Sequence, residues 1–98
     1  MRGMAKSYRL SPLAEADLEE IWLYTAKCWS MEQADTYHRN FVKAFEELAA
    51  GLKQGRPSVL PDFQKYLCGS HVIYFLMYAD CLDVIRILHQ RQDVERHL

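Results

Sequence analysis

The stretch HVIYFLMYADCLDVIRILH, residues 71–89, decides the fold of this 98-residue chain. It contains two runs, residues 71–78 and 81–89, that are apolar almost throughout and are separated only by Ala79 and Asp80. A two-residue connection typically joins antiparallel strands. Runs this apolar are typical of central strands that are covered on at least one face. The stretch therefore predicts the middle of an antiparallel sheet.

Two further strands are predicted around this hairpin. Residues 64–68 form a strand-like run that only Gly69 and Ser70 separate from the hairpin, so the three runs should form a meander. Residues 53–63, which contain one glycine and two prolines, are the one long loop before it. Near the start of the chain, residues 5–10 alternate between apolar and polar side chains, which indicates a short first strand.

Two amphipathic helices are predicted between the first strand and the loop. Ser11 followed by Pro12 is a typical helix start, and apolar residues at three-and-four spacing extend this helix to about Trp29. Ser30 can cap a second helix, whose apolar stripe extends to Leu52. The short connection predicts an antiparallel helix hairpin. The order of elements indicates an α+β fold, with the hairpin packed on one face of a small, mostly antiparallel sheet.

Composition narrows the class of protein. A chain of 98 residues is long enough for a single domain, so we expect one domain over residues 1–98. The formal net charge of -1 gives no general attraction to nucleic acid, and direct nucleic-acid binding is not expected. The longest apolar run, residues 72–79, is too short to cross a bilayer, and the N-terminus lacks the apolar segment of a secretory signal. We therefore expect a cytoplasmic protein without a membrane partner, in which Met4 could be an alternative start.

The cysteines do not predict a disulfide framework. Cys28, Cys68 and Cys81 are odd in number, and none belongs to a C-x-x-C motif. Each lies in an apolar stretch, so we expect three reduced cysteines in the core.

The predicted first helix carries four acidic residues: Glu15, Asp17, Glu19 and Glu20. Paired carboxylates can act as a general acid and a general base. A solvated helix face explains the four residues better, and negative charge near a helix start is also favourable. We therefore expect all four carboxylates at the surface.

The charged C-terminus offers only weak evidence for a metal site. His89, Asp93 and His97 follow one another at intervals of four, so a helical tail would place them on one face, where zinc could bind. Without a C-x-x-C or H-E-x-x-H motif, polar surface residues are the better interpretation, and we expect no metal or cofactor. The sequence also lacks a G-x-S-x-G motif and a glycine-rich phosphate loop, so no catalytic residue is predicted.

Three segments, in this order and spacing, resemble the ParE-type toxins of bacterial toxin–antitoxin modules, which belong to the ParE/RelE superfamily. They are YRLSPLAEADLEEIWLYTA at residues 8–26, GSHVIYFLMY at residues 69–78 and IRILHQRQDVERHL at residues 85–98. The resemblance spans residues 8–98. It implies the same fold, two helices against a small sheet. It also implies a toxin that inhibits growth and is held inactive by a cognate antitoxin encoded beside it.

The two branches of this superfamily act differently, and the sequence favours one of them. RelE-like members cut messenger RNA on the ribosome, whereas ParE-like members inhibit DNA gyrase and trap it on cleaved DNA. An arginine that follows the first turn of the meander in RelE-like toxins corresponds here to Val72, and their C-terminal tyrosine has no counterpart beside His97 and Leu98. Only Arg91 would match one of their basic residues. The resemblance therefore implies a non-enzymatic gyrase inhibitor. A ribosome-dependent nuclease, and a module member with another or a lost target, remain alternatives.

The basic residues near the C-terminus are then the candidate target-binding residues. Arg86, His89, Arg91 and Arg96 follow one another closely, but neighbouring acidic residues weaken their field, which is unfavourable for a nucleic-acid site. We expect them to form an edge that docks another protein rather than a reaction centre.

The antitoxin should cover surfaces that this fold leaves open. A helix hairpin beside a small sheet leaves a groove and an open strand edge. The resemblance implies that a disordered antitoxin segment covers them and becomes ordered on binding. Trp22, Trp29 and Tyr37 could anchor such a segment if they are exposed, although a place in the core is expected for Trp22 and Tyr37.

Overall fold

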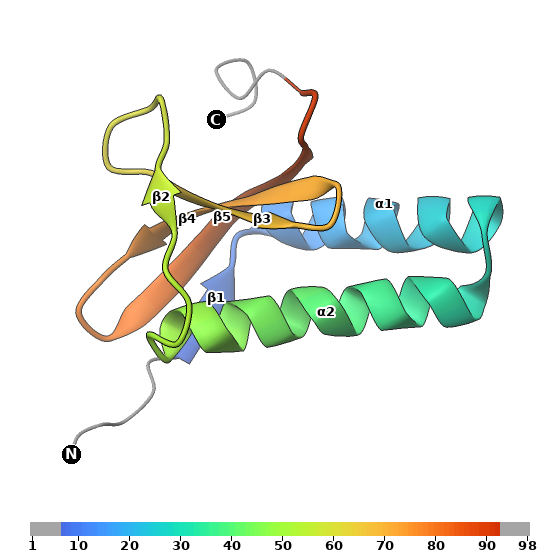
Figure 1. Ribbon diagram of the computed structural model, residues 1–98, viewed down its shortest axis with the longest axis horizontal. Coiled ribbons are helices and arrows are strands. Elements are labelled where there is room, and N and C mark those ends of the chain that lie inside the picture. Colours follow the sequence, from blue (N-terminus) through green and yellow to red (C-terminus); the bar gives the residue numbers. More distant parts are fainter. Residues whose placement is uncertain (1–6, 93–98) are drawn as a thin grey trace.

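Two antiparallel helices pack against one face of a five-stranded sheet in the computed structural model of the chain, which describes residues 7–92 (Figure 1). The elements are β1 (Ser7–Leu10), α1 (Pro12–Cys28), α2 (Met31–Ala49), β2 (Arg56–Pro57), β3 (Gln64–Cys68), β4 (His71–Met77) and β5 (Cys81–His89). The predicted α+β fold and its order of elements are confirmed.

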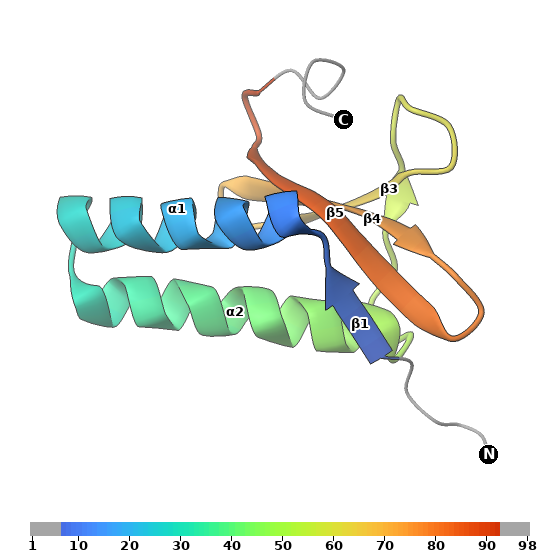
Figure 2. The same cartoon turned by 180° about the vertical axis from the view of Figure 1, so that it is seen from behind.

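The sheet has the strand order β1-β5-β4-β3-β2. Strands β3, β4 and β5 form the predicted antiparallel meander, and β1 lies parallel to β5 at one edge, as Figure 2 shows from behind. The crossover from β1 to β5 includes the whole helix hairpin, which is why these two strands can be parallel. At the other edge, the two-residue strand β2 pairs with β3 inside the segment that was expected to be only a loop.

Local capping explains where the helices begin. The side chain of Ser11 accepts a hydrogen bond from the backbone N–H of Ala14 at 3.0 Å, and Ser30 accepts one from Gln33 at 3.0 Å. Helix α2 ends at Ala49, so the prediction of a stripe extending to residue 52 was too long. Within residues 7–92, no helix is both long and apolar enough to span a membrane.

The core lies between the hairpin and the sheet. Its main side chains are Ala14 and Leu18 of α1, Phe41, Phe45 and Leu48 of α2, Ile73 and Phe75 of β4, and Leu82, Val84 and Ile87 of β5. Burying one such large side chain stabilises a fold by about 1.5–3 kcal/mol. The two middle strands supply half of this list, as their continuous apolar runs predict.

Strand β5 is longer than its neighbour β1, so part of its outer edge has no partner strand. The start of helix α1 covers this part. Strand β1 pairs with β5 only as far as Val84. Beyond that point, the backbone N–H of Ser11 donates to the Val84 carbonyl at 2.9 Å, and the Ser11 hydroxyl donates to the Ile85 carbonyl at 2.6 Å. The N–H of Ile87 donates to a carboxylate oxygen of Asp17 at 2.9 Å. Ser11, the N-cap residue of α1, and the Asp17 side chain thus replace the missing strand.

The Asp17 carboxylate is buried and paired with Arg86. The Arg86 Nε donates to Asp17 Oδ2 at 2.8 Å and its Nη2 donates to Oδ1 at 2.9 Å, a bidentate contact between α1 and β5. Hydrogen bonding to Asp17 raises the pKa of Arg86. The prediction of a fully solvated acidic face was therefore wrong for Asp17, which is only 8% exposed, although the other three acidic residues of α1 are exposed.

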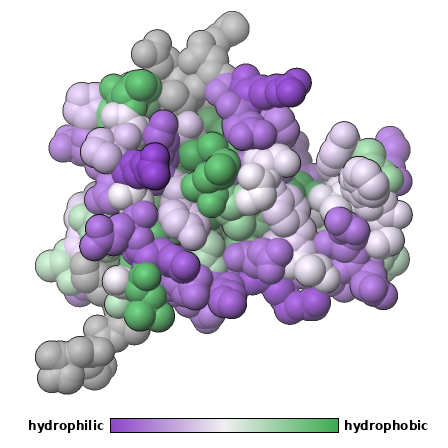
Figure 3. All heavy atoms as spheres, viewed as in Figure 1, coloured by the Kyte–Doolittle hydropathy of each residue, from purple (hydrophilic) through white to green (hydrophobic). Residues whose placement is uncertain are grey.

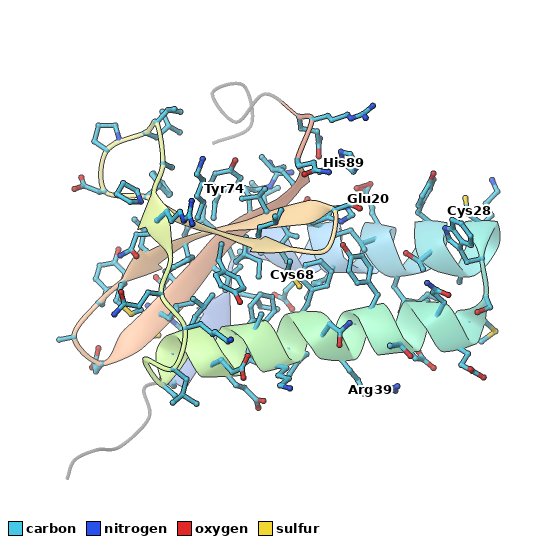
Figure 4. The ribbon with its side chains drawn as sticks, in the orientation of Figure 1. Glu20, Cys28, Arg39, Cys68, Tyr74 and His89 are labelled. Carbon is cyan, nitrogen blue, oxygen red and sulfur yellow. The ribbon has the colours of Figure 1, made fainter. Side chains whose placement is uncertain are left out.

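The three cysteines are unpaired but differ in burial. Cys81 is buried and Cys68 is half-buried, and burial raises the pKa of the Cys68 thiol. Cys28 is exposed, so the prediction of a core position was wrong for this residue. It lies at the end of α1 that extends past the sheet, where no strand covers it (Figure 4).

Removing the Asp17 carboxylate should destabilise the fold. In Asp17→Ala, the Arg86 guanidinium and the Ile87 N–H both lose the carboxylate that they contact, and breaking a buried ion pair typically costs about 3–5 kcal/mol. The free energy of unfolding, measured by urea denaturation, should fall by this amount. Glu19→Ala, an exposed position on the same helix, is the matched control and should change it by less than about 0.5 kcal/mol. Equal effects of the two substitutions would contradict the structural role of Asp17.

Candidate interaction site

A groove lies between the helix hairpin and the end of the sheet. It has a volume of about 470 Å³, and its walls come from α1, α2, the β3–β4 turn and the end of β5. The side chains that matter most are Tyr24, Trp29, Tyr37, Asn40, His71 and His89. Among the described lining residues none is an aspartate, glutamate, lysine or arginine. The groove is therefore aromatic and polar, and it is uncharged when its two histidines are neutral.

Tyr37 joins α2 to the β3–β4 turn. Its hydroxyl oxygen lies 3.1 Å from the Cys68 carbonyl, 3.1 Å from the Ser70 backbone nitrogen and 2.8 Å from His71 Nδ1. The turn leaves just enough room for this contact, because a Cβ atom at Gly69 would lie 2.5 Å from the hydroxyl. Gly69 also has a φ of 61°, which a side chain would make unfavourable. The turn and the helix therefore fit together only with glycine at this position.

The three contacts of Tyr37 limit how His71 can be protonated. A backbone N–H can only donate, so the Ser70 N–H points to the hydroxyl oxygen. The hydroxyl proton can go to the Cys68 carbonyl, with His71 Nδ1 donating to the hydroxyl oxygen, or to a neutral His71 Nδ1. When His71 is charged, Nδ1 carries a hydrogen and donates to the hydroxyl oxygen, and the hydroxyl then donates to Cys68.

His89 is the second imidazole of the groove. Its ring centroid lies 5.4 Å from that of His71, with the two ring planes almost perpendicular. The backbone N–H of Arg91 donates to His89 Nδ1 at 3.2 Å, so the neutral ring of His89 carries its hydrogen on Nε2. Burial, and secondarily the proximity of His89, lower the pKa of His71, while Asp17 opposes the shift. The arrangement therefore favours neutral His71.

Comparisons with known proteins agree with this fold and sequence. Residues 8–94 match the family model described as the ParE toxin of the type II toxin–antitoxin system parDE. A protein named Toxin ParE1 from Mycobacterium tuberculosis is 40% identical in an alignment 98 positions long. The alignment covers 97% of this chain and 100% of the relative. Another protein named Toxin ParE1, from Caulobacter vibrioides, is 35% identical, with 95% of this chain and 98% of the relative covered. The chain belongs to the ParE toxin family.

Solved structures of similar fold also come from toxin–antitoxin systems. The chromosomal ParDE system of P. aeruginosa matches with a TM-score of 0.76 at 21% identity, covering 87% of this chain and 96% of that one. The RelBE2 toxin–antitoxin complex of Mycobacterium tuberculosis matches with a TM-score of 0.59 at 14% identity, covering 89% and 100%. At these identities the two matches show the shared ParE/RelE fold alone.

The structure describes three of the four basic residues that were predicted to form one docking edge, and their surroundings differ. Arg86 is half-buried and bound to Asp17, whereas His89 lies in the groove and Arg91 is exposed in the turn after β5. Arg96 lies outside the described residues. For this family member, a role of these residues in target binding remains a prediction, and Arg86 clearly has a structural role as well.

The other candidate residues also have defined places. Asp93 and His97 of the considered zinc set lie outside the described residues, and within residues 7–92 no cluster of three histidine, cysteine or acidic residues could hold a metal ion. Tyr37 packs against the core as expected, but Trp22 is only half-buried, and its indole N–H donates to Asp35 at 2.9 Å. Trp29 is 73% exposed and remains available as an anchor.

The exposed apolar side chains are dispersed rather than continuous. The face shown in Figure 3 is predominantly hydrophilic, with separate small hydrophobic patches. Hydrophobic surface alone therefore does not mark a docking site on this face, and the groove is distinguished by its shape and its histidine pair.

The free energy of unfolding should fall as the pH decreases below about 6.5, the ordinary histidine pKa. Because the folded state lowers the pKa of His71, the unfolded state binds more protons in this range. The stabilising contribution is complete above the ordinary pKa, decreases as the pH falls toward the lowered one, and is lost below it. Urea denaturation at a series of pH values measures this slope.

Two histidine substitutions test the source of that slope. In His71→Gln the slope should become shallower, because glutamine does not titrate but can still contact the Tyr37 hydroxyl. His38→Gln, at an exposed histidine of α2, should leave the slope unchanged. The same slope in the wild type and in His71→Gln would show that His71 is not responsible.

Proposed function

We propose that this ParE-type toxin inhibits growth by binding DNA gyrase and trapping it on cleaved DNA, and that a cognate antitoxin neutralises it. Gyrase inhibition is the action that the resemblance of the sequence to ParE-like toxins implies. The similar structures come from toxin–antitoxin systems, which supports an antitoxin partner.

Two positions on the meander, Val72 and Arg86, support this proposal over RNA cleavage. Val72, at the position of the RelE-like arginine, is half-buried and lies opposite Leu88 in the sheet. Arg86, the arginine within β5, directs its guanidinium at Asp17. Catalysis of RNA cleavage needs cations preorganised around the phosphate. Neither position offers one.

The proposed target-binding edge is therefore the end of β5 and the turn that follows it. His89 is half-buried there, Arg91 is exposed, and Arg96 follows closely in the sequence. Exposed charges at the rim of a protein interface steer association and specify the partner. Arg86 supports this edge from within by holding β5 against α1.

A gyrase supercoiling assay tests the proposal. The purified chain should stall supercoiling or increase the amount of cleaved DNA, and Arg91→Ala should weaken this effect by about tenfold, which corresponds to about 1.4 kcal/mol of binding free energy. Lys43→Ala, at an exposed cation on α2, is the matched control and should inhibit like the wild type.

The alternatives predict different outcomes in parallel assays. A ribosome-dependent nuclease would leave gyrase active at several-fold excess of the chain and would cut messenger RNA in a translation extract, with less cutting by Arg91→Ala. A module member with another or a lost target would do neither. Normal growth on expression without an antitoxin would favour a lost target.

A further inference from the structure

The histidine pair lies where two cavities meet. A second cavity of about 340 Å³ shares Tyr24, His71 and His89 with the groove and extends along the outer edge of β5 past Glu20. Figure 4 shows Glu20 and His89 close to each other on the side of α1 that faces this strand end. A segment bound in the groove would therefore cover both imidazoles.

In the described part of the chain, two carboxylates and one guanidinium are the charged groups near His71. The titratable and charged groups near it are Tyr37 on α2, Tyr24, Asp17 and Glu20 on α1, Cys68 on β3, and Arg86 and His89 on β5. The Asp17 carboxylate already binds the Arg86 guanidinium and the Ile87 N–H. Glu20 is exposed and also interacts electrostatically with Arg86. These groups together carry one negative charge, which a proton on His71 would cancel, so burial is the main factor that disfavours the charged ring.

Protonation of His71 would not break the contact that holds the groove together. In the charged ring Nδ1 donates to the Tyr37 hydroxyl oxygen, and the hydroxyl donates to the Cys68 carbonyl, so both contacts are kept. The wall of the groove can therefore keep its shape while its charge changes. Protonation of the pair would therefore change the affinity of the groove for a partner without unfolding the groove.

We propose that the groove binds an uncharged, largely apolar segment of the antitoxin, and that protonation of the His71–His89 pair weakens this binding. The inference rests on the antitoxin partner of the proposed function. The uncharged lining argues for an uncharged segment, and the exposed rings of Tyr24 and Trp29, 67% and 73% exposed, offer apolar surface at the rim.

The direction of the effect follows from desolvation. A bound apolar segment would remove water from both imidazoles, which costs little when they are neutral and much more when they are charged. Binding would therefore release protons at acidic pH, and the complex would weaken as the pH falls. A segment with carboxylates facing the pair would have the opposite effect, because binding would then favour the charged rings.

Calorimetric titration of the full-length chain with the full-length protein encoded beside its gene tests this proposal. The dissociation constant should be about tenfold higher at about pH 5.5 than at about pH 7.5, as expected when roughly one proton is released. His71→Gln and His89→Gln should each bring this ratio closer to one, while His38→Gln should preserve it. Circular dichroism at both pH values confirms that each variant is folded.

A second pair of variants places the partner in the groove. Trp29→Ala should weaken binding at neutral pH, whereas Leu52→Ala, which removes an equally exposed apolar side chain outside the groove, should not. Binding that is independent of pH, or tighter at acidic pH, would overturn this inference and leave the antitoxin partner intact. No binding by the neighbouring protein at either pH would overturn both the antitoxin partner and this inference.

Discussion

The contact between Asp17 and the outer edge of β5 is the constraint on which the arrangement of the remaining elements depends. Strand β1 is too short to cover β5, so a helix side chain has to satisfy the Ile87 N–H. A carboxylate does this, but burying its charge is costly without a partner, and Arg86 on the same strand supplies one. The pair fixes one end of α1 against the sheet. The rest of this straight helix then places Tyr24, two turns further on, along the wall of the groove.

This constraint separates residues that build the edge from residues that can bind a target. An arginine whose Nε and Nη2 both donate to a buried carboxylate has little freedom to follow a phosphate or a partner protein. Arg91, which lies in the turn that follows β5, is exposed and has that freedom. Arg86 and Arg91 therefore have different surroundings, although they are close in the sequence. The structural role of Arg86 also offers a physical reason for an arginine at this position that is independent of any target.

Local signals predicted most of the fold, whereas contacts between distant residues were not predictable. Caps, periodic apolar stripes and two-residue turns depend on neighbouring residues, so the helices and the meander follow from the sequence. Asp17 resembles any acidic residue on a solvated helix face, and its partner is 69 residues away. The position of His71 opposite His89 in the sheet was partly predictable from the sequence. A hairpin around Ala79 and Asp80 brings the start of β4 opposite the end of β5, but the bulge near Val84 shifts this register by one residue.

The contacts of Tyr37 would allow His71 to gain a proton while the wall of the groove keeps its hydrogen bonds. Tyr37 has one donor and two acceptor sites, and Cys68, Ser70 and His71 can use all three. Because this set can be complete in both protonation states of His71, protonation changes the electrostatic potential of the groove rather than its geometry. A rigid wall also lowers the entropy cost of binding, since it does not have to become ordered around a partner. The effect of a proton on the binding free energy would therefore come mainly from the desolvation of the two imidazoles. A bound apolar segment would cause this desolvation.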